Sequence, residues 1–335
     1  MSEPATLVVG PSWVGDMVMA QSMLKVLKQR HPEQAVDVLA PGWSLPLLER
    51  MPEVRAGIEM TLGHGRLGLG RRWRLGRSLT GRYDRAILLP NSWKSAIVPW
   101  AAGIPRRTGW RGEMRYGLVN DLRVLDRSAL TMTVQRFVAL AVDSSEPLPE
   151  IPPPLLEVRQ ADVQAALEVH GLEKSGREVL ALCPGAEYGP AKRWLEANFG
   201  ELAQKYRNRG WEVWLFGSEK DRKVCDNIAA LATGCRNLAG RTTLAEAVDL
   251  LSLADAVVSN DSGLMHVAAA LERSLVAIYG SSDPGFTPPL NERHAILYRN
   301  LACSPCFKRE CPLGHLQCMK EITVSEVEDA LKGME

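Results

Sequence analysis

The feature that most constrains this chain is an alternation of apolar runs with amphipathic segments, broken once by a proline-rich stretch. Apolar runs at 6–10, 35–41 and 85–90 begin the alternation, and it restarts with runs at 178–184, 211–217, 255–259 and 274–280. This order is typical of parallel sheets covered by helices. The interruption, DSSEPLPEIPPPLLEV (residues 143–158), carries five prolines and can be neither a helix nor a central strand.

We therefore predict an α/β protein with two doubly wound parallel-sheet domains that face a cleft. A chain of 335 residues is long for a single core. The predicted domains are 1–150 and 151–320, followed by a C-terminal helix within 321–335 that could pack back toward the N-terminal domain. No apolar run is long enough to span a membrane and no export signal precedes the first strand, so we expect a cytoplasmic protein.

The net charge of +1 conceals an asymmetry between the halves. Residues 1–150 contain 20 Lys and Arg against 14 Asp and Glu, whereas the remainder contains 20 against 25, so the halves carry +6 and −5. The excess is concentrated in residues 61–115, which have 12 basic and 2 acidic side chains. Such a stretch suggests an anionic partner for the first domain.

The stretch VSNDSGLMHVAAAL (residues 258–271) places four polar or small residues between an apolar strand and a small-residue helix. Ligands of open parallel sheets bind beyond the carboxyl ends of the strands, and helix N-termini there present free N–H groups that suit phosphate. Asn, Asp and Ser are also the ordinary residues that cap helices. On this stretch alone, the cap is the favoured interpretation.

Two further loops shift the balance toward a phosphate site. CPGAEYGPAKRW (residues 183–194) delivers Lys192 just before a helix, where a cation could neutralise a diphosphate; the alternative is a surface lysine at the electrostatically unfavourable end of a helix. GPSWVGDMVMAQSML (residues 10–24) lacks the GxGxxG fingerprint. It sets Asp16 at a helix start, where a carboxylate stays ionised and can either accept a proton or simply stabilise its helix.

Six signatures run in order from residue 11 to residue 319: PSWVGDMVMAQ, PGAEYGPAKRW, LFGSEKD, LAGRTTLAEAVDLLSLADAVVSNDSGLMHVAAAL, AIYGSSDPGFTPPL and CSPCFKRECPLGHLQCM. Together they resemble the ADP-heptose:lipopolysaccharide heptosyltransferases of glycosyltransferase family 9, and most of all the members that add the second heptose. The resemblance covers nearly the whole chain. It implies the GT-B architecture, two Rossmann-like domains facing a cleft, which agrees with the pattern of strands and helices.

The resemblance also implies a reaction, the inverting transfer of L-glycero-D-manno-heptose from ADP-L-glycero-β-D-manno-heptose to the first heptose of heptosyl-Kdo2-lipid A, in lipopolysaccharide core biosynthesis. By this analogy Asp16 deprotonates the acceptor hydroxyl and Lys192 stabilises the departing diphosphate, without a metal or other required cofactor. The residues that the analogy places against the donor are Glu219, Thr242, Asp261, Ser262, Gly263 and His266. The alternatives are another family 9 transferase, such as one with first-heptose specificity, and a nucleotide-sugar binding module without turnover.

The basic stretch RLGLGRRWRLGRSLTGRYDR (residues 66–85) lies in the domain that takes the acceptor in this family. We therefore assign Arg71, Arg72 and Arg74 to the anionic, lipid-anchored Kdo-lipid A acceptor. Trp73 and its neighbours could also contact the cytoplasmic face of the inner membrane. A solvated basic helix is the alternative, whereas a pI near 7.6 and the lack of a binding motif disfavour nucleic acid.

Four cysteines, Cys303, Cys306, Cys311 and Cys318, lie within sixteen residues. Two cysteines three apart, followed by two more, are compatible with a structural zinc site, although the spacing is not that of a standard finger. The alternatives are a cluster of reduced thiols and a disulfide. The reducing environment of the cytoplasm, where we expect the protein, disfavours the disulfide.

Overall fold

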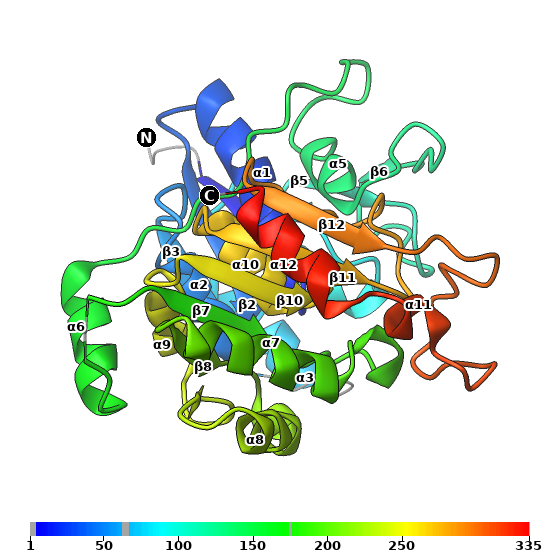
Figure 1. Cartoon of the computed structure of the whole chain (residues 1–335). Helices are drawn as coiled ribbons and strands as arrows, with labels where there is room; N and C mark the ends of the chain where they lie inside the picture. The colour runs from blue at the N-terminus through cyan, green and yellow to red at the C-terminus, as the bar shows by residue number, and fades with distance from the viewer. Residues whose placement is uncertain (1–4, 62–66, 174–175, 335) are drawn as a thin grey trace. The chain divides into compact units, whose positions relative to one another are not determined.

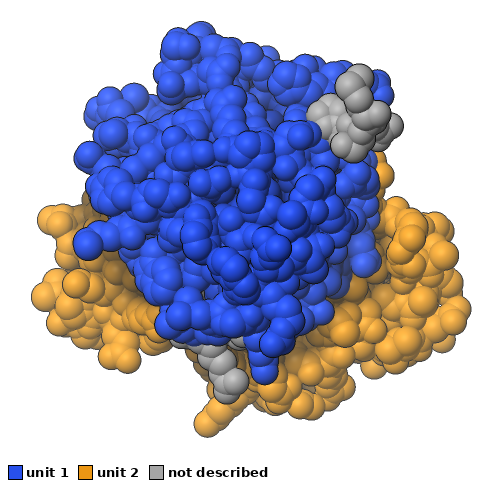
Figure 2. Space-filling view, turned by 180° about the vertical axis from the view of Figure 1, so that it is seen from behind, with its two compact units in different colours: residues 1–154 blue, residues 155–335 orange. Residues whose placement is uncertain are grey.

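The computed structural model describes residues 5–61, 67–173 and 176–334, and the chain divides into two compact units, Met1–Pro154 and Leu155–Glu335 (Figures 1 and 2). Arg66, the first residue of the predicted basic stretch, lies outside the described residues. The boundary between the units lies inside the proline-rich segment 143–158, which forms no helix or strand.

Unit 1 is built on a six-stranded sheet in the order β3-β2-β1-β4-β5-β6, and every neighbouring pair is parallel. Its strands are β1 (Ala5–Val9), β2 (Ala35–Pro41), β3 (Ala56–Met60), β4 (Arg85–Leu88), β5 (Arg106–Trp110) and β6 (Asp121–Arg123). Its helices are α1 (Val14–Arg30), α2 (Leu45–Leu48), α3 (Leu69–Ser78), α4 (Ile97–Ala101) and α5 (Thr133–Val138).

Unit 2 repeats this plan with a parallel sheet in the order β12-β11-β10-β7-β8-β9. Its strands are β7 (Val179–Cys183), β8 (Glu212–Leu215), β9 (Arg236–Asn237), β10 (Ala256–Asn260), β11 (Ser274–Tyr279) and β12 (His294–Tyr298). Its helices are α6 (Gln160–Val169), α7 (Glu196–Asn208), α8 (Arg222–Leu231), α9 (Leu244–Leu251), α10 (Gly263–Ala270), α11 (Gln317–Lys320) and α12 (Val324–Lys332).

The two sheets have the same topology. If the strands of each unit are counted from its own first strand, both orders read 3-2-1-4-5-6, the Rossmann order. The central strands β1, β7 and β10 are buried along their whole length, as expected for parallel strands covered by helices on both faces. The order reverses between β1 and β4 in unit 1 and between β7 and β10 in unit 2, which places one potential binding crevice in each unit.

The C-terminal helix α12, predicted within residues 321–335, belongs to the core of unit 2. Its residues Val324, Val327 and Leu331 join the apolar cluster that includes β7, β8 and α7. On its polar side, the buried carboxylate of Glu328 accepts hydrogen bonds from Lys205 and Arg209 of the α7 segment. Helix α12 begins with a capping box between Thr323 and Glu326.

None of the helices in the part of the chain that the structure describes has both the length and the hydropathy needed to cross a bilayer.

Candidate active site

The turn between β10 and α10 lies at the point where the strand order of unit 2 reverses. Asn260, at the end of β10, is fully buried and joins this turn to the loop after β7. Its side-chain oxygen accepts a hydrogen bond from the Trp194 backbone N–H at 2.9 Å, and its side-chain nitrogen donates to the Pro184 carbonyl at 2.7 Å. The loops after β7 and β10 are therefore held together on either side of the crevice.

The capping interpretation of this turn is not what the structure shows. Ser262 occupies the N-cap of α10 and makes no side-chain capping hydrogen bond; its hydroxyl lies 3.3 Å from that of Ser259. Asn260 is committed to the β7 loop and Asp261 to the contacts described next, so neither side chain caps the helix. The N-terminus of α10, which begins at Gly263, thus carries no side-chain cap. Uncapped first-turn amides can receive an anion.

Lys192 and Asp261 meet across this crevice. The Lys192 ammonium lies 2.5 Å from Oδ2 of Asp261, and the side chains are 18% and 5% exposed. Ser282, in the loop after β11, donates a hydrogen bond to the same carboxylate oxygen. Arg193, by contrast, pairs with Asp221 at the start of α8. Of the two cations in the loop, only Lys192 is thus brought to the α10 turn.

The lysine loop is held in place from several sides. Trp194 is buried and donates its indole N–H to the Ile322 carbonyl, which anchors the end of the loop in the core. The Tyr188 ring lies 5.3 Å from the Lys192 ammonium, and its hydroxyl donates to the Phe307 carbonyl. A side chain at Gly189 would bring its Cβ to 2.4 Å from the Arg309 carbonyl oxygen, so only glycine allows this close approach.

His266, one turn into α10, is also buried next to these charges. The pKa of His266 is lowered to about 4, chiefly by burial; the carboxylate of Asp261 partly offsets this effect and the positive charge of Lys192 adds to it. The imidazole is therefore neutral at neutral pH. A neutral ring has one N–H donor and one nitrogen acceptor available, which suits contact with a polar ligand better than with a second cation.

Glu219 and Thr242, the donor residues predicted between Lys192 and Asp261, lie together at the carboxyl ends of β8 and β9. Glu219 is exposed and pairs with Arg222 at 3.2 Å. It lies against Gly240, where an added Cβ would fall 2.1 Å from the Glu219 carboxylate, and Thr242 follows two residues later. An ion pair between Lys220 and Glu187 links this segment to the lysine loop. All the donor residues predicted in unit 2 therefore lie on loops or on the first turns of helices that follow the carboxyl ends of its strands.

In unit 1 the equivalent edge of the sheet carries Asp16, on the first turn of α1, and a cavity whose lining does not include Asp16. Asp16 is partly buried in the first turn of α1, directly after β1. A cavity of about 420 Å³ lies beyond the carboxyl ends of β1, β2, β3 and β4. Its polar lining includes Ser12, Glu59, Arg72, Lys94 and Ser95. Of these, only Arg72 was assigned from the sequence; the others lie in a loop, at the end of β3 and in a short 3-10 helix, none of which has a distinctive sequence pattern.

The three predicted acceptor arginines differ in their surroundings. Arg72 is 8% exposed, lines the cavity and donates to the Leu67 carbonyl at 3.0 Å. Arg71 and Arg74 are exposed on the surface of α3. The prediction from the sequence assigned all three to the acceptor. Successive residues of a helix point about 100° apart, however, and of these three arginines only Arg72 lines the cavity.

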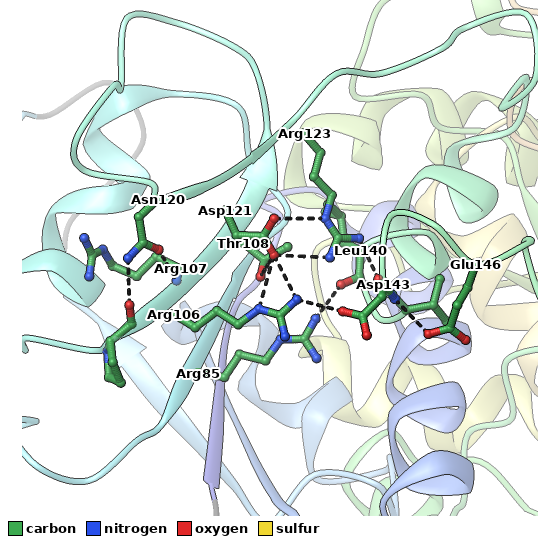
Figure 3. Close-up of polar contacts among 12 residues, drawn as sticks. Arg85, Arg106, Arg107, Thr108, Asn120, Asp121, Arg123, Leu140, Asp143 and Glu146 are labelled. Atoms are coloured by element: carbon green, nitrogen blue, oxygen red, sulfur yellow. Dashed lines mark hydrogen bonds and ion pairs between the residues drawn. The ribbon is translucent and has the colours of Figure 1, made fainter.

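Several arginines of residues 61–115 serve the fold of unit 1 instead of a ligand. Arg106 pairs with Asp121 and Asp143, and Arg85 donates to the Leu140 carbonyl, as Figure 3 shows. Arg115 is almost fully buried and donates to the carbonyls of Pro90 and Trp110. The charge excess of residues 61–115 therefore overstates how much positive charge faces a partner.

The four-cysteine segment packs against the lysine loop. The Arg309 carbonyl, between Cys306 and Cys311, accepts the Ala191 backbone N–H at 3.0 Å. All four thiols are free, and Cys318 is buried. Backbone N–H donors, first that of Leu316, lower the pKa of Cys311.

Within residues 5–61, 67–173 and 176–334, no three His, Cys, Asp or Glu side chains are arranged to hold a metal ion. The structural zinc at Cys303, Cys306, Cys311 and Cys318 thus stays a prediction from spacing. Elemental analysis of protein purified without chelator tests it. One zinc per chain, lost when the cysteines are replaced by serine, would support the site, and no zinc would end the idea.

Comparison with known proteins gives one consistent answer. The family model for glycosyltransferase family 9 (heptosyltransferase) matches residues 72–317. Lipopolysaccharide heptosyltransferase 2 of Salmonella typhimurium is 48% identical over 98% of this chain and 97% of its own length, and the protein of the same name from Escherichia coli K12 is also 48% identical with the same coverage. The solved structure of E. coli ADP-heptose lipopolysaccharide heptosyltransferase II has a TM-score of 0.88 and 45% identity, with 98% of each chain covered. The two Rossmann units, the loops at their crevices and these matches together show that the chain belongs to glycosyltransferase family 9, the heptosyltransferases.

Proposed function

We propose that this chain is a lipopolysaccharide heptosyltransferase of the second kind, which transfers a heptose from ADP-L-glycero-β-D-manno-heptose to the first heptose of heptosyl-Kdo2-lipid A. The observation that carries the proposal is the contact of Lys192 and Asp261 beside the uncapped N-terminus of α10. A cation and a helix N-terminus at a topological switch point are suited to a nucleoside diphosphate. The full-length similarity to heptosyltransferases 2 supports the choice of sugar and acceptor.

In the proposed mechanism, Lys192 and the amides of Ser262 and Gly263 offset the charge that builds on the diphosphate as it leaves. Asp261 orients the heptose, and the neutral His266 lines the same pocket. Glu219 and the backbone of Thr242 contact the adenosine. No divalent cation has a role in this proposal, since a lysine and a helix dipole supply the positive charge.

Asp16 is the proposed general base. Its place in the first turn of α1 favours the ionised carboxylate, because the positive end of the helix dipole stabilises a negative charge. An ionised carboxylate can accept the proton of the acceptor hydroxyl while that oxygen attacks the anomeric carbon. One displacement by the acceptor inverts the anomeric configuration, and it requires a single base.

The cavity of unit 1 is the proposed acceptor subsite. Arg72 and Lys94 line it, and guanidinium and ammonium groups bind the carboxylates of acidic sugars such as Kdo. Ser12, Ser95 and Glu59 add hydrogen-bonding groups for sugar hydroxyls. The cavity thus combines a positive wall with polar groups, as an anionic saccharide requires.

A transfer assay with matched acceptors tests the proposed function. Purified protein is given ADP-heptose and Kdo2-lipid A that carries either no heptose or one heptose. We expect product only with the acceptor that already carries one heptose. Transfer to the acceptor without heptose would assign first-heptose specificity instead, and ADP-heptose binding without any transfer would indicate a binding module.

We further propose that the protein contacts the cytoplasmic face of the inner membrane through the Trp73 face, defined as Leu67, Leu69, Trp73 and Trp100. These four side chains are between 44% and 49% exposed, and the Trp73 and Trp100 rings lie 5.4 Å apart. Exposed arginines 71, 74 and 77 flank them on α3, and the sequence has no acidic residue between Met60 and Tyr83. Exposed tryptophans beside cations suit the interface of an anionic bilayer.

Vesicle co-sedimentation tests the Trp73 face. We expect the protein to sediment with vesicles of phosphatidylethanolamine that contain phosphatidylglycerol, and much less with phosphatidylethanolamine alone. The double variant Trp73→Ala, Trp100→Ala should lose this binding, whereas Met114→Ala with Val169→Ala, two exposed apolar side chains elsewhere, should keep it. Equal binding of both double variants would contradict the assignment.

A further inference from the structure

Two adjacent serines after β11 differ sharply in what their hydroxyls contact. Ser281 and Ser282 are both buried, at 1% and 5% exposure. The Ser282 hydroxyl donates to Oδ2 of Asp261 at 2.5 Å. Among the described residues, the Ser281 hydroxyl has no hydrogen-bond partner. The same loop therefore offers one hydroxyl committed to the donor site and one that is not.

A single carboxylate oxygen of Asp261 accepts hydrogen bonds from both the Lys192 ammonium and the Ser282 hydroxyl. Oδ2 lies 2.5 Å from the Lys192 ammonium and 2.5 Å from the Ser282 hydroxyl. The backbone of Asp261 is fixed independently, because its N–H donates to the Ile278 carbonyl at 3.0 Å. Its carboxylate is thus held by one cation on a long, flexible stem and by one neutral hydroxyl on a short side chain that follows the sheet.

The Lys192 ammonium and the Ser282 hydroxyl should respond differently when a diphosphate binds. Lys192 pairs with Asp261 directly before the N-terminus of α10, so a diphosphate bound there competes with Asp261 for its ammonium. A buried carboxylate that loses its partner is costly and free to rotate. Ser282 has no net charge and is not drawn to phosphate in this way, so its hydrogen bond can persist while the lysine turns.

We infer that Ser282 is a positioning residue that holds the Asp261 carboxylate in place while Lys192 engages the diphosphate. The inference rests on the proposed function, since it gives Asp261 the task of orienting the transferred sugar. Ser282 itself need not touch the donor. It acts through Asp261, and its loss should slow transfer more than it weakens donor binding.

The test compares three variants of the full-length protein under steady-state conditions. Ser282→Ala should lower kcat about tenfold, the size expected for a lost hydrogen bond to a charged group, with less than a twofold change in the KM for ADP-heptose. Ser282→Thr keeps the hydroxyl and should recover most of the rate. Ser281→Ala removes the neighbouring, unpartnered hydroxyl and should match the wild type.

A double-mutant cycle shows whether Ser282 acts through Asp261. In the Asp261→Ala background, which lacks the acceptor oxygen, Ser282→Ala should cause little further loss. A full tenfold loss in that background, or equal effects of Ser282→Ala and Ser281→Ala, would overturn the inference. If Ser282→Ala does not fold, Ser282→Cys, which keeps the side-chain size but donates weakly, replaces it with the same expected split between kcat and KM.

The wild-type rate separates this inference from the proposed function. If the wild type transfers heptose and Ser282→Ala transfers it equally fast, only the role of Ser282 fails. If the wild type transfers no heptose to any lipid A acceptor, the proposed function fails first.

Discussion

The two units share one strand order and have very different crevices. In unit 2 the crevice is occupied by a connected set of charges and hydrogen bonds, in which Asp261 accepts from both Lys192 and Ser282. In unit 1 the corresponding edge of the sheet opens into a cavity of about 420 Å³ lined by Arg72 and Lys94. The comparison suggests that unit 2 is preorganised for a small anionic group at a fixed point, whereas unit 1 has room for a larger saccharide.

The comparison also shows that positive charge has different uses in the two units. Unit 2 has a net negative sequence, yet it places one lysine where a diphosphate is expected. Unit 1 has the excess of arginine, and many of these side chains bind its own carboxylates and carbonyls, as in the cluster of Arg85, Arg106 and Arg123 (Figure 3). Net charge along the sequence is therefore a poor guide to the number of cations that face a ligand.

The largest expected effect is that of removing the proposed base in unit 1. Asp16→Asn keeps the shape of the side chain but cannot accept a proton, so transfer should fall by about 10³-fold. ADP-heptose affinity, which we assign to unit 2, should change little when measured by calorimetry. Near-normal transfer by Asp16→Asn would remove Asp16 from the mechanism.

The next largest effect should come from the lysine of unit 2. Lys192→Ala should weaken ADP-heptose binding and slow transfer by about 10²-fold, because the diphosphate loses its cation. Lys220→Ala is the matched control: it removes an exposed lysine on the neighbouring loop that pairs with Glu187 at the surface. Similar kinetics for the two variants would mean that the leaving group does not depend on Lys192.

His266 predicts a pH dependence of stability that unit 1 should not share. Burial lowers the pKa of His266 to about 4, below its value near 6.5 in the unfolded chain. The unfolded state therefore binds the proton more readily, so this contribution is present above pH 6.5 and is lost as the pH falls toward 4.

The His266 contribution should amount to about 2 kcal/mol less free energy of unfolding at pH 5 than at pH 7. Urea unfolding of wild type and His266→Gln at both pH values measures it, since the variant lacks the titrating ring. If wild type and variant lose the same stability between pH 7 and pH 5, His266 is not the group responsible.

A smaller effect, on the KM for the acceptor, should distinguish Arg72 from Arg71 and Arg74 of α3. Arg72→Gln removes the cation that lines the cavity and should raise the KM for a heptosyl-Kdo2 acceptor without lipid about tenfold. Arg71→Gln with Arg74→Gln removes two exposed charges and should change that KM less than threefold, because exposed charges are screened by solvent and salt. If the exposed pair had the larger effect, the cavity would not be the acceptor subsite.

Much of the fold could be predicted from the sequence because its central strands are buried and consist mostly of apolar residues. The run at 35–41 is β2, and the runs at 178–184 and 274–280 contain β7 and β11. Two of the strands that were missed lack that signal. β3 (Ala56–Met60) is largely exposed or half-buried, and β9 has only two residues.

The site could be predicted to the level of loops but not of individual contacts. Lys192 and Asp261 each follow an apolar strand, so their place at one edge of the sheet could be inferred. Asn260 has the residue type of a helix cap, yet it ties two loops together, because its depth in the core puts two backbone groups within reach. The roles of Ser282 and Arg72 depend on tertiary packing, which no local pattern encodes.

Hydrogen exchange with and without ADP tests the central claim most directly, namely that unit 2 holds the nucleotide and unit 1 does not. With saturating ADP, the account predicts slower exchange of backbone amides in residues 188–194 and 261–266, and little change at residues 10–12 and 92–95 around the cavity of unit 1. Slower exchange around that cavity, with no change in residues 261–266, would contradict it.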